Sequence, residues 1–321
     1  MLFSRRIRIS ISIVVMLSFI IYTNHILQAK IQQPVFSTRS LTDSSPIFIN
    51  SNDAFEVLGF SGNGSESNPF LIENLRVVST GQLGSAIVIS NTDVYFIIQN
   101  CEITTQYIGI YIQPTVLPGT AKIINNTVTC DTISGGGIAI GTDETLIENN
   151  TISGFMQGIH VNEANNEIIK GNSVLLSYYQ GINIRHSSFN TIINNDIRNS
   201  NQHGLAIVGS TSMYNIIYNN IFVNNSNLPI YEIDGGVITG DTNSQGYDGG
   251  SNNQWYDDVN QKGNLWDDYE NNGPYNIDGS ADAVDQYPLR YITGTTESIF
   301  LPLFSILVFI CLIAEIVKRR R

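Results

Sequence analysis

The sequence predicts an all-β fold, a right-handed single-stranded parallel β-helix of about seven coils with a cap at each end. Two observations predict it: a short pattern of isoleucine and asparagine recurs along the chain, and the composition favours strands over helices. Only 14% of the 321 residues are charged and 42% are hydrophobic, so uncharged polar residues must cover most of the surface. Asparagine, glycine, serine and β-branched residues are poor helix formers, which makes strands and turns the expected elements.

The pattern Ile-x-x-Asn-x-Ile, or a close variant, occurs seven times between residues 70 and 234. Its first isoleucines lie 22 to 26 residues apart, and they are Ile72, Ile98, Ile123, Ile147, Ile169, Ile192 and Ile217. A second pattern, Gly-Ile-x-Ile or a relative of it, follows six of the seven units. Short alternating strands at this period predict a solenoid, because each coil can bury its isoleucines only against the next coil. Leucine-rich repeats share the period, but the leucine framework and the helical half-repeat are both missing.

Asparagines fill two adjacent positions of the repeat, and we expect both positions to be structural. The first accepts only Asn or Gly, the residues that tolerate left-handed backbone, and therefore indicates a bend. It holds Asn74, Asn100, Asn125, Asn149, Gly171, Asn194 and Asn219. Side chains at the second position are expected to point inward and to bond from coil to coil as an amide ladder. The predicted ladder residues are Asn126, Asn150, Asn172, Asn195 and Asn220.

The two ends of the chain differ from the repeats. A basic start followed by 14 apolar residues predicts a signal peptide or an N-terminal anchor over 1–29. The apolar segment 298–317 predicts a transmembrane helix, and the basic tail 318–321 is expected to stay in the cytoplasm. The protein is therefore expected in the cell membrane, with its β-helix outside the cytoplasm. Between these ends we expect a linker and N-terminal cap at 30–69, the repeats at 70–234 and a C-terminal cap at 235–290.

Charge excludes one class of partner. The region between the two apolar ends holds nine basic and 27 acidic residues, and the whole chain carries a net charge of −12. Nucleic-acid binding requires a basic surface, so no nucleic-acid partner is expected. An acidic, asparagine-rich surface is compatible with cations, or with polysaccharides and proteins of a cell surface. Cys101 and Cys130 fall in different columns of the repeat and are not expected to pair.

Candidate catalytic residues follow the Gly-Ile-x-Ile pattern. Glu163 and His186 occupy one column on adjacent coils, and Arg185 precedes His186. A carboxylate beside a histidine can act as an acid–base pair or as a pair of metal ligands. The alternative is a surface hydrogen bond at a turn. The outward positions that flank the asparagine ladder never place two acids on adjacent coils, which argues against a glycosidase, since that reaction needs two neighbouring carboxylates.

Three further residues are candidate ligand contacts. His160 is expected to project outward one strand step before Glu163, and Tyr178 and Tyr179 lie in the loop before the next strand. Tyrosine rings in such a loop offer a stacking face to a sugar. The histidines fall on different columns, so the sequence shows no cluster of imidazoles for copper.

The predicted C-terminal cap contains a repeated short motif and many acidic residues. Asn253-x-Trp255 is repeated as Asn264-x-Trp266, so the two tryptophans of the chain are expected to cover the open end of the core. Carboxylate and carbonyl oxygens are the ligands that Ca²⁺ prefers. The candidate calcium ligands are Asp278, Asp282 and Asp285, although the segment lacks the final glutamate of an EF-hand. A solvated, turn-rich cap without metal is the alternative.

The caps and repeats together carry a family resemblance. The lead-in FSGNGSESNPFLIE (60–73), the asparagine and isoleucine repeats, and the motifs GNLWDDY (263–269) and GPYNIDG (273–279) resemble the NosD-type right-handed β-helix proteins. The resemblance covers about residues 46–290. It implies an exported surface protein of archaeal type, in a group that includes carbohydrate-binding and sugar-hydrolysing β-helices. Copper enters only through this resemblance, because the namesake protein is an accessory in copper-site maturation.

We therefore expect a membrane-anchored β-helix that binds surface glycans or proteins without catalysis. Two alternatives stay open: a polysaccharide lyase or glycosidase, and a NosD-like accessory for copper delivery.

Overall fold

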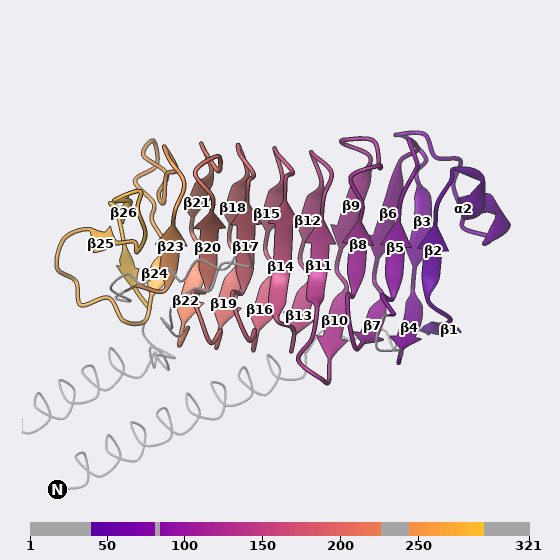
Figure 1. Ribbon diagram of the computed structural model, residues 1–321, viewed down its shortest axis with the longest axis horizontal. Helices are drawn as coiled ribbons and strands as arrows, with labels where there is room; N and C mark the ends of the chain where they lie inside the picture. Colours follow the sequence, from indigo (N-terminus) through magenta and orange to yellow (C-terminus); the bar gives the residue numbers. More distant parts are fainter. Residues whose placement is uncertain (1–39, 81–83, 226–243, 292–321) are drawn as a thin grey trace, which may run out of the picture. The chain divides into compact units, whose positions relative to one another are not determined.

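The computed structural model describes residues 40–80, 84–225 and 244–291, and those from Leu41 onward belong to one compact unit, a solenoid of parallel strands (Figure 1). The predicted leader at 1–29, transmembrane helix at 298–317 and basic tail lie outside the described residues. Within the described residues, no helix is long and apolar enough to span a bilayer.

Three parallel sheets run along the solenoid, and each complete coil supplies one strand to each of them. Sheet A consists of β1 (Thr42–Ser44), β4 (Leu75–Ser79), β7 (Glu102–Thr105), β10 (Thr127–Cys130), β13 (Thr151–Ser153), β16 (Ser173–Leu175), β19 (Asp196–Arg198), β22 (Ile221–Val223), β24 (Leu265–Trp266) and β27 (Leu289–Arg290). Sheet B consists of β2 (Ile47–Ile49), β5 (Ile87–Ile89), β8 (Ile110–Ile112), β11 (Gly136–Ile140), β14 (Gln157–Asn162), β17 (Ile182–Arg185), β20 (Leu205–Val208) and β23 (Gly246–Asp248). Sheet C consists of β3 (Phe70–Glu73), β6 (Phe96–Gln99), β9 (Ala121–Ile124), β12 (Leu146–Glu148), β15 (Ile168–Lys170), β18 (Thr191–Ile193) and β21 (Ile216–Tyr218).

Seven coils are complete among the described residues, and partial coils at both ends extend the solenoid to about eight turns. Strands β1 and β2 lie inside the segment that the sequence assigns to the N-terminal cap. Strands β23, β24 and β27 lie inside the predicted C-terminal cap. The helix α2 (Asp53–Val57) and an antiparallel pair of short strands, β25 (Tyr275–Asn276) and β26 (Val284–Asp285), lie at opposite ends of the stack (Figure 1).

The register of the predicted repeat is confirmed by the strand pairing. The isoleucines of sheet C pair from coil to coil, for example Ile147 with Ile169 and Ile169 with Ile192. The predicted bend is confirmed as well, since Asn125 and Asn149 have φ angles of 57° and 55°. This bend divides the pattern Ile-x-x-Asn-x-Ile into two strands, one in sheet C and one in sheet A.

The asparagine ladder runs through the buried interior beside this bend. Each Nδ2 donates to the Oδ1 of the asparagine one coil further on, at 2.9 to 3.0 Å. The same Oδ1 also accepts the backbone N–H of the asparagine on the preceding coil. All five predicted residues, Asn126, Asn150, Asn172, Asn195 and Asn220, are no more than 1% exposed. The ladder continues to Asn264, which accepts from Asn220 at 3.0 Å. A column of amides inside the core is tolerated because its donors and acceptors are paired.

A second ladder, which the sequence analysis missed, lies at the bend between sheets B and C. The backbone N–H of Thr145 donates to Glu167 Oε2 at 2.8 Å, and the N–H of Glu167 donates to Asn190 Oδ1 at 2.8 Å. The amide line continues through Asn190 and Asn215 to Asn253. These residues stand two positions before the isoleucine column, so the same period would have revealed them.

Aromatic rings close both ends of the core. Phe55 of α2 stacks on Phe70, with ring centroids 4.8 Å apart. At the other end Trp266 stacks between Phe222 and Tyr275, with centroid distances of 4.2 and 4.1 Å. Both tryptophans are fully buried, which confirms that the largest side chains of the chain cover this end. The two buried cysteines are free, as expected.

Candidate functional site

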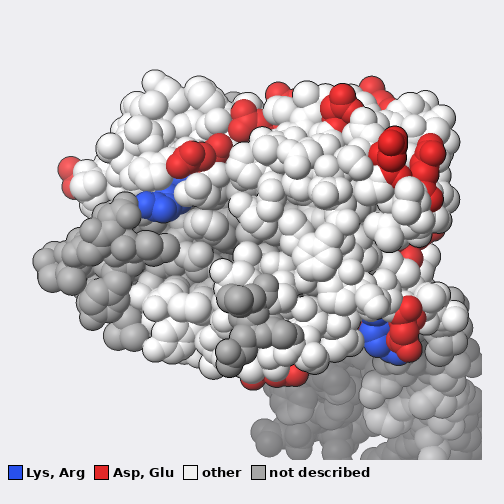
Figure 2. Space-filling model, turned by 45° about the vertical axis from the view of Figure 1, so that its right-hand side comes forward, with Lys and Arg blue, Asp and Glu red and all other residues white. Residues whose placement is uncertain are grey.

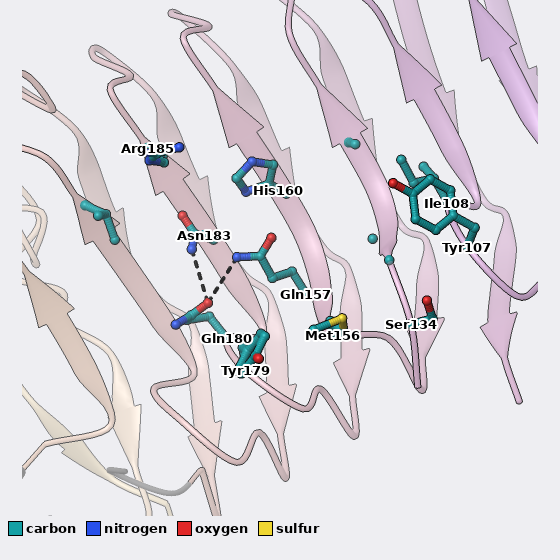
Figure 3. Close-up of a pocket in the computed structure, with 14 residues that line it drawn as sticks. Tyr107, Ile108, Ser134, Met156, Gln157, His160, Tyr179, Gln180, Asn183 and Arg185 are labelled. Carbon is teal, nitrogen blue, oxygen red and sulfur yellow. Dashed lines mark hydrogen bonds between the residues drawn. The ribbon is translucent and has the colours of Figure 1, made fainter. Parts of the chain in front are cut away.

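A groove of about 510 Å³ lies on the outer face of sheet B, over β11, β14 and β17 (Figure 3). Its floor is made by strand residues and its wall by the loops that enter β8, β11, β14 and β17. The floor includes Ala139, His160, Asn183 and Val208, and the wall includes Tyr107, Ile108, Ser134, Met156 and Tyr179. The loops that lead into sheet B therefore form one side of the groove.

The position of His160 follows from the alternation of a strand. Ile159 and Val161 on either side of it are fully buried, so the side chain between them points away from the core. His160 pairs with Ala139 on one neighbouring coil and with Asn183 on the other. Asn183 pairs in turn with Ala206. Because the small side chain of Ala139 stands beside His160, the floor is low here and a hollow remains.

A network of amides fixes the side chains of the groove floor. Gln180 Oε1 accepts from Gln157 Nε2 at 3.2 Å and from Asn183 Nδ2 at 3.1 Å (Figure 3). The Nε2 of Gln180 donates to Gln202 Oε1. Because Gln180 uses its oxygen for two donors and its nitrogen for a third partner, the amide orientation of Asn183 is set by its neighbours.

Two polar atoms of the groove floor have no hydrogen-bond partner in the described structure. They are Nδ1 of His160 and Oδ1 of Asn183, on adjacent strands. Asn183 is only 6% exposed. Native proteins rarely leave a buried polar atom unpaired, because losing its hydrogen bond to water costs about 1–3 kcal/mol. Two such atoms on adjacent strands of one groove indicate a place where a ligand completes the bonding.

The groove is nearly uncharged at neutral pH. Burial, assisted by the charge of Arg185, lowers the pKa of His160 to about 4, so its imidazole is neutral. Among the described residues that line the groove, none is Asp or Glu and only Arg185 carries a formal charge. The lining therefore lacks the carboxylate pair that glycoside hydrolysis requires.

The groove brings together some of the residues predicted from the sequence. His160, Tyr179 and Arg185 all line it. Tyr178 lies outside the lining, is 48% exposed, and meets Tyr179 edge to face with ring centroids 5.1 Å apart. The sequence analysis missed Gln157, Gln180 and Asn183. The variable position of Gly-Ile-x-Ile, read as a column, and the residue before its glycine contain the signal that would have found them.

Glu163 and His186 lie outside the groove, at the exposed bend after sheet B. Their coils are aligned as expected, since the neighbouring residues Asn162 and Arg185 pair in the strands. Both have left-handed backbone, with φ of 54° and 48°. His186 Nδ1 is 3.0 Å from Thr211 Oγ1 on the following coil. The imidazole is thus directed toward Thr211, away from the coil of Glu163.

The three candidate calcium ligands are not gathered in one place. Asp278 Oδ2 contacts His203 Nε2 and the N–H of Ser244, both at 3.1 Å. Asp285 is fully buried and accepts hydrogen bonds from the protein, whereas Asp282 is exposed. Within the part of the chain that the structure describes, no three His, Cys, Asp or Glu side chains are grouped as a metal site.

A family model described as a right handed beta helix region matches residues 116–264, which lie within the stacked coils. The repeat region is a right-handed parallel β-helix. The match includes β11, β14 and β17 under the groove and ends at Asn264 on the asparagine ladder. No curated protein matches the sequence of this β-helix.

The β-helix is similar in fold to several solved structures of low sequence identity. The enzymatically active domain of tailspike protein 2 from bacteriophage CBA120 matches with a TM-score of 0.35 and 11% identity, over 67% of this chain and 38% of that chain. The A-module of a mannuronan C-5 epimerase from Azotobacter vinelandii has a TM-score of 0.36 and 13% identity, over 80% and 76%. An alginate lyase from Paenibacillus sp. has a TM-score of 0.31 and 14% identity, over 78% and 96%. These similarities concern the fold alone.

Proposed function

We propose that the protein is a non-catalytic glycan-binding β-helix that holds a sugar chain in the groove on sheet B. The observation that carries the proposal is the pair of unpartnered polar atoms, His160 Nδ1 and Asn183 Oδ1, on the floor of that groove. A sugar hydroxyl can both donate and accept, so one hydroxyl can satisfy two such neighbouring atoms.

The rest of the lining suits the apolar faces of a sugar ring. Tyr107 and Tyr179 supply aromatic surface, and Ile108, Met156 and Val208 supply aliphatic surface. Ligand sites commonly combine a mostly apolar lining with a few fixed polar groups that set the orientation of the ligand. Here the fixed groups are the amides around Gln180. The absence of acidic residues from the described lining supports binding without hydrolysis.

Display at the cell surface is part of the proposal. The apolar segment 298–317 would anchor the β-helix in the membrane, and the leader at 1–29 would export it. Surface polysaccharide is then the partner that the groove meets. A NosD-type relationship and a role in copper delivery remain expectations from the sequence resemblance.

A glycan array with the full-length chain in detergent micelles tests this function, followed by calorimetry on each polymer that binds. We expect at least one polysaccharide to bind the wild type, and Asn183→Leu to weaken that binding because it removes the floor amide. His186→Ala is the matched control, since His186 is exposed and lies outside the groove. Absence of binding to every polymer on the array would refute the proposal.

One observation favours a second candidate, a polysaccharide lyase. His160 is neutral at pH 7 and lies in the same groove as Arg185. A neutral imidazole can remove the proton next to a uronate carboxylate, and a nearby cation favours the charge that develops. The glycosidic C–O bond β to the carboxylate then breaks, a C=C bond forms, and the leaving oxygen takes a proton from water. Appearance of the unsaturated product, followed by its ultraviolet absorbance and lost in His160→Gln, would establish the lyase. Intact polymer after long incubation would exclude it.

A further inference from the structure

We infer that the groove selects an uncharged sugar, a hexose or an N-acetylhexosamine unit, and that Asn183 is the residue that excludes uronates and other anions. This inference rests on the proposed glycan-binding function and goes further by naming the class of sugar. It depends on which end of the Asn183 amide faces the ligand.

The amide network leaves an acceptor unpaired on the groove floor. Asn183 Nδ2 is used by Gln180 Oε1 at 3.1 Å, and Gln180 is in turn bonded to Gln157 and Gln202. Rotating the Asn183 amide would place its oxygen against the oxygen of Gln180. The unpartnered Oδ1 therefore stays free to accept, and a ligand must bring an O–H or N–H donor to it.

A negatively charged group is a poor match for this position. A carboxylate or sulfate has only acceptor oxygens, so beside Asn183 Oδ1 it would lose water without gaining a donor. His160 on the adjacent strand is neutral and supplies no compensating charge. Arg185, the one charged residue of the described lining, already has an interaction partner.

The negative charge of the whole chain also disfavours anionic sugars. The net charge is −12, which raises the energy of an approaching polyanion. Figure 2 shows a face that is mostly uncharged, with scattered acidic side chains and few basic ones. A hydroxyl is the group that matches the two floor atoms, because it can donate to Asn183 Oδ1 while it interacts with His160 Nδ1. An acetamido N–H would serve the same acceptor.

The test compares neutral and anionic polymers on the full-length chain in detergent micelles. The probes are mannan, glucan and chitin oligosaccharides on one side, and polymannuronate and polygalacturonate on the other. We expect the wild type to bind a neutral polymer at least tenfold more tightly than either uronate. We expect Asn183→Ala to weaken the binding of neutral polymers by about 3- to 10-fold, the range for one hydrogen bond. The ratio between the affinities for neutral polymers and for uronates should become smaller.

The outcomes separate this inference from the function on which it rests. Tighter binding of uronates by the wild type overturns the inference and leaves glycan binding intact, whereas no binding of any probe overturns both. Asn183→Leu, which keeps the branched shape of the side chain, replaces Asn183→Ala if that variant melts early. If both folded variants bind and discriminate like the wild type, Asn183 is not the selective residue. His186→Ala is expected to behave like the wild type throughout.

Discussion

The backbone N–H of Asn264 donates to Oδ2 of Asp285 at 2.7 Å, so the asparagine ladder ends on a buried carboxylate. The same oxygen accepts the indole N–H of Trp266 at 2.9 Å. The second ladder ends in the same way, because Asp248 accepts from Asn253 Nδ2 at 2.9 Å and from the indole of Trp255 at 3.0 Å. In the repeated Asn-x-Trp motif, the asparagine is therefore the last amide of a ladder, and the tryptophan covers the end of the core.

Replacement of the ladder-ending carboxylate is expected to destabilise the fold. In Asp285→Asn an NH₂ group replaces one oxygen. Both oxygens of Asp285 accept N–H groups, so in either amide orientation the new NH₂ would lie against another donor. One unpaired buried group costs about 1–3 kcal/mol, so we expect a loss of that size in urea unfolding. Asp282→Asn, three residues away and exposed, is the matched control and should unfold like the wild type. Equal losses in the two variants would contradict the role of Asp285.

The buried carboxyl of Glu167 is expected to lower stability at neutral and higher pH. Burial raises its pKa to about 9, although the hydrogen bond from Thr145 opposes this shift. A group with a raised pKa in the folded state gives its full stability below its unfolded pKa, near 4.5, and loses it as the pH rises through 9. Glu167→Gln should therefore raise the unfolding free energy at pH 7 by roughly 2–3 kcal/mol and change it little at pH 4.

Urea titrations at both pH values check the Glu167 prediction. Glu66→Gln makes the same chemical change at an exposed position and should have no effect at either pH. A stability difference for Glu167→Gln that does not depend on pH would show that the carboxyl is not protonated in the folded state.

Two neighbouring glycines are expected to differ sharply in their tolerance of alanine. A Cβ on Gly137 would lie 2.3 Å from Ile152 Cγ2 and 2.6 Å from the carbonyl oxygen of Gly158 on the next coil. A Cβ on Gly136 would meet nothing closer than 3.9 Å. Overpacking of a core typically costs about 1–3 kcal/mol, so Gly137→Ala should lower the melting temperature and Gly136→Ala should not. Similar melting curves would mean that the coils can move apart at this glycine.

Acid should destabilise the protein partly through His160. Its pKa is lowered from 6.5 to about 4, first by burial and then by Arg185. A histidine with a lowered pKa contributes stability that is full above pH 6.5 and is lost as the pH falls through 4. Between pH 7 and pH 4, the free energy of unfolding should therefore fall by about 1–3 kcal/mol less in His160→Gln than in the wild type. His186→Gln, exposed at the bend, should follow the wild type, and an unchanged acid sensitivity in His160→Gln would contradict the prediction.

Most of the fold could be predicted because the contacts between coils repeat with the sequence. The alignment of Ile147 with Ile169 and Ile192 follows from spacing alone. The left-handed bend follows equally directly, since only Asn and Gly stand at its position. The sequence did not reveal that the Ile-x-x-Asn-x-Ile unit is divided between two sheets. Apolar residues alternate in the same way before and after the one-residue bend, so the pattern does not show where one sheet ends and the next begins.

The sequence by itself determined the stacking register, the bend and the amide ladder of this protein, because each depends on residue type at a fixed period. Only the tertiary structure decided the groove. Its floor needs His160 and Asn183 on adjacent strands beside Ala139, and its wall needs loops of different length to rise on the same side of sheet B. The orientation of the Asn183 amide depends on Gln157, Gln180 and Gln202, which meet only after three coils have stacked. Hydrogen-bond direction is a property of that assembled network, and no single repeat contains it.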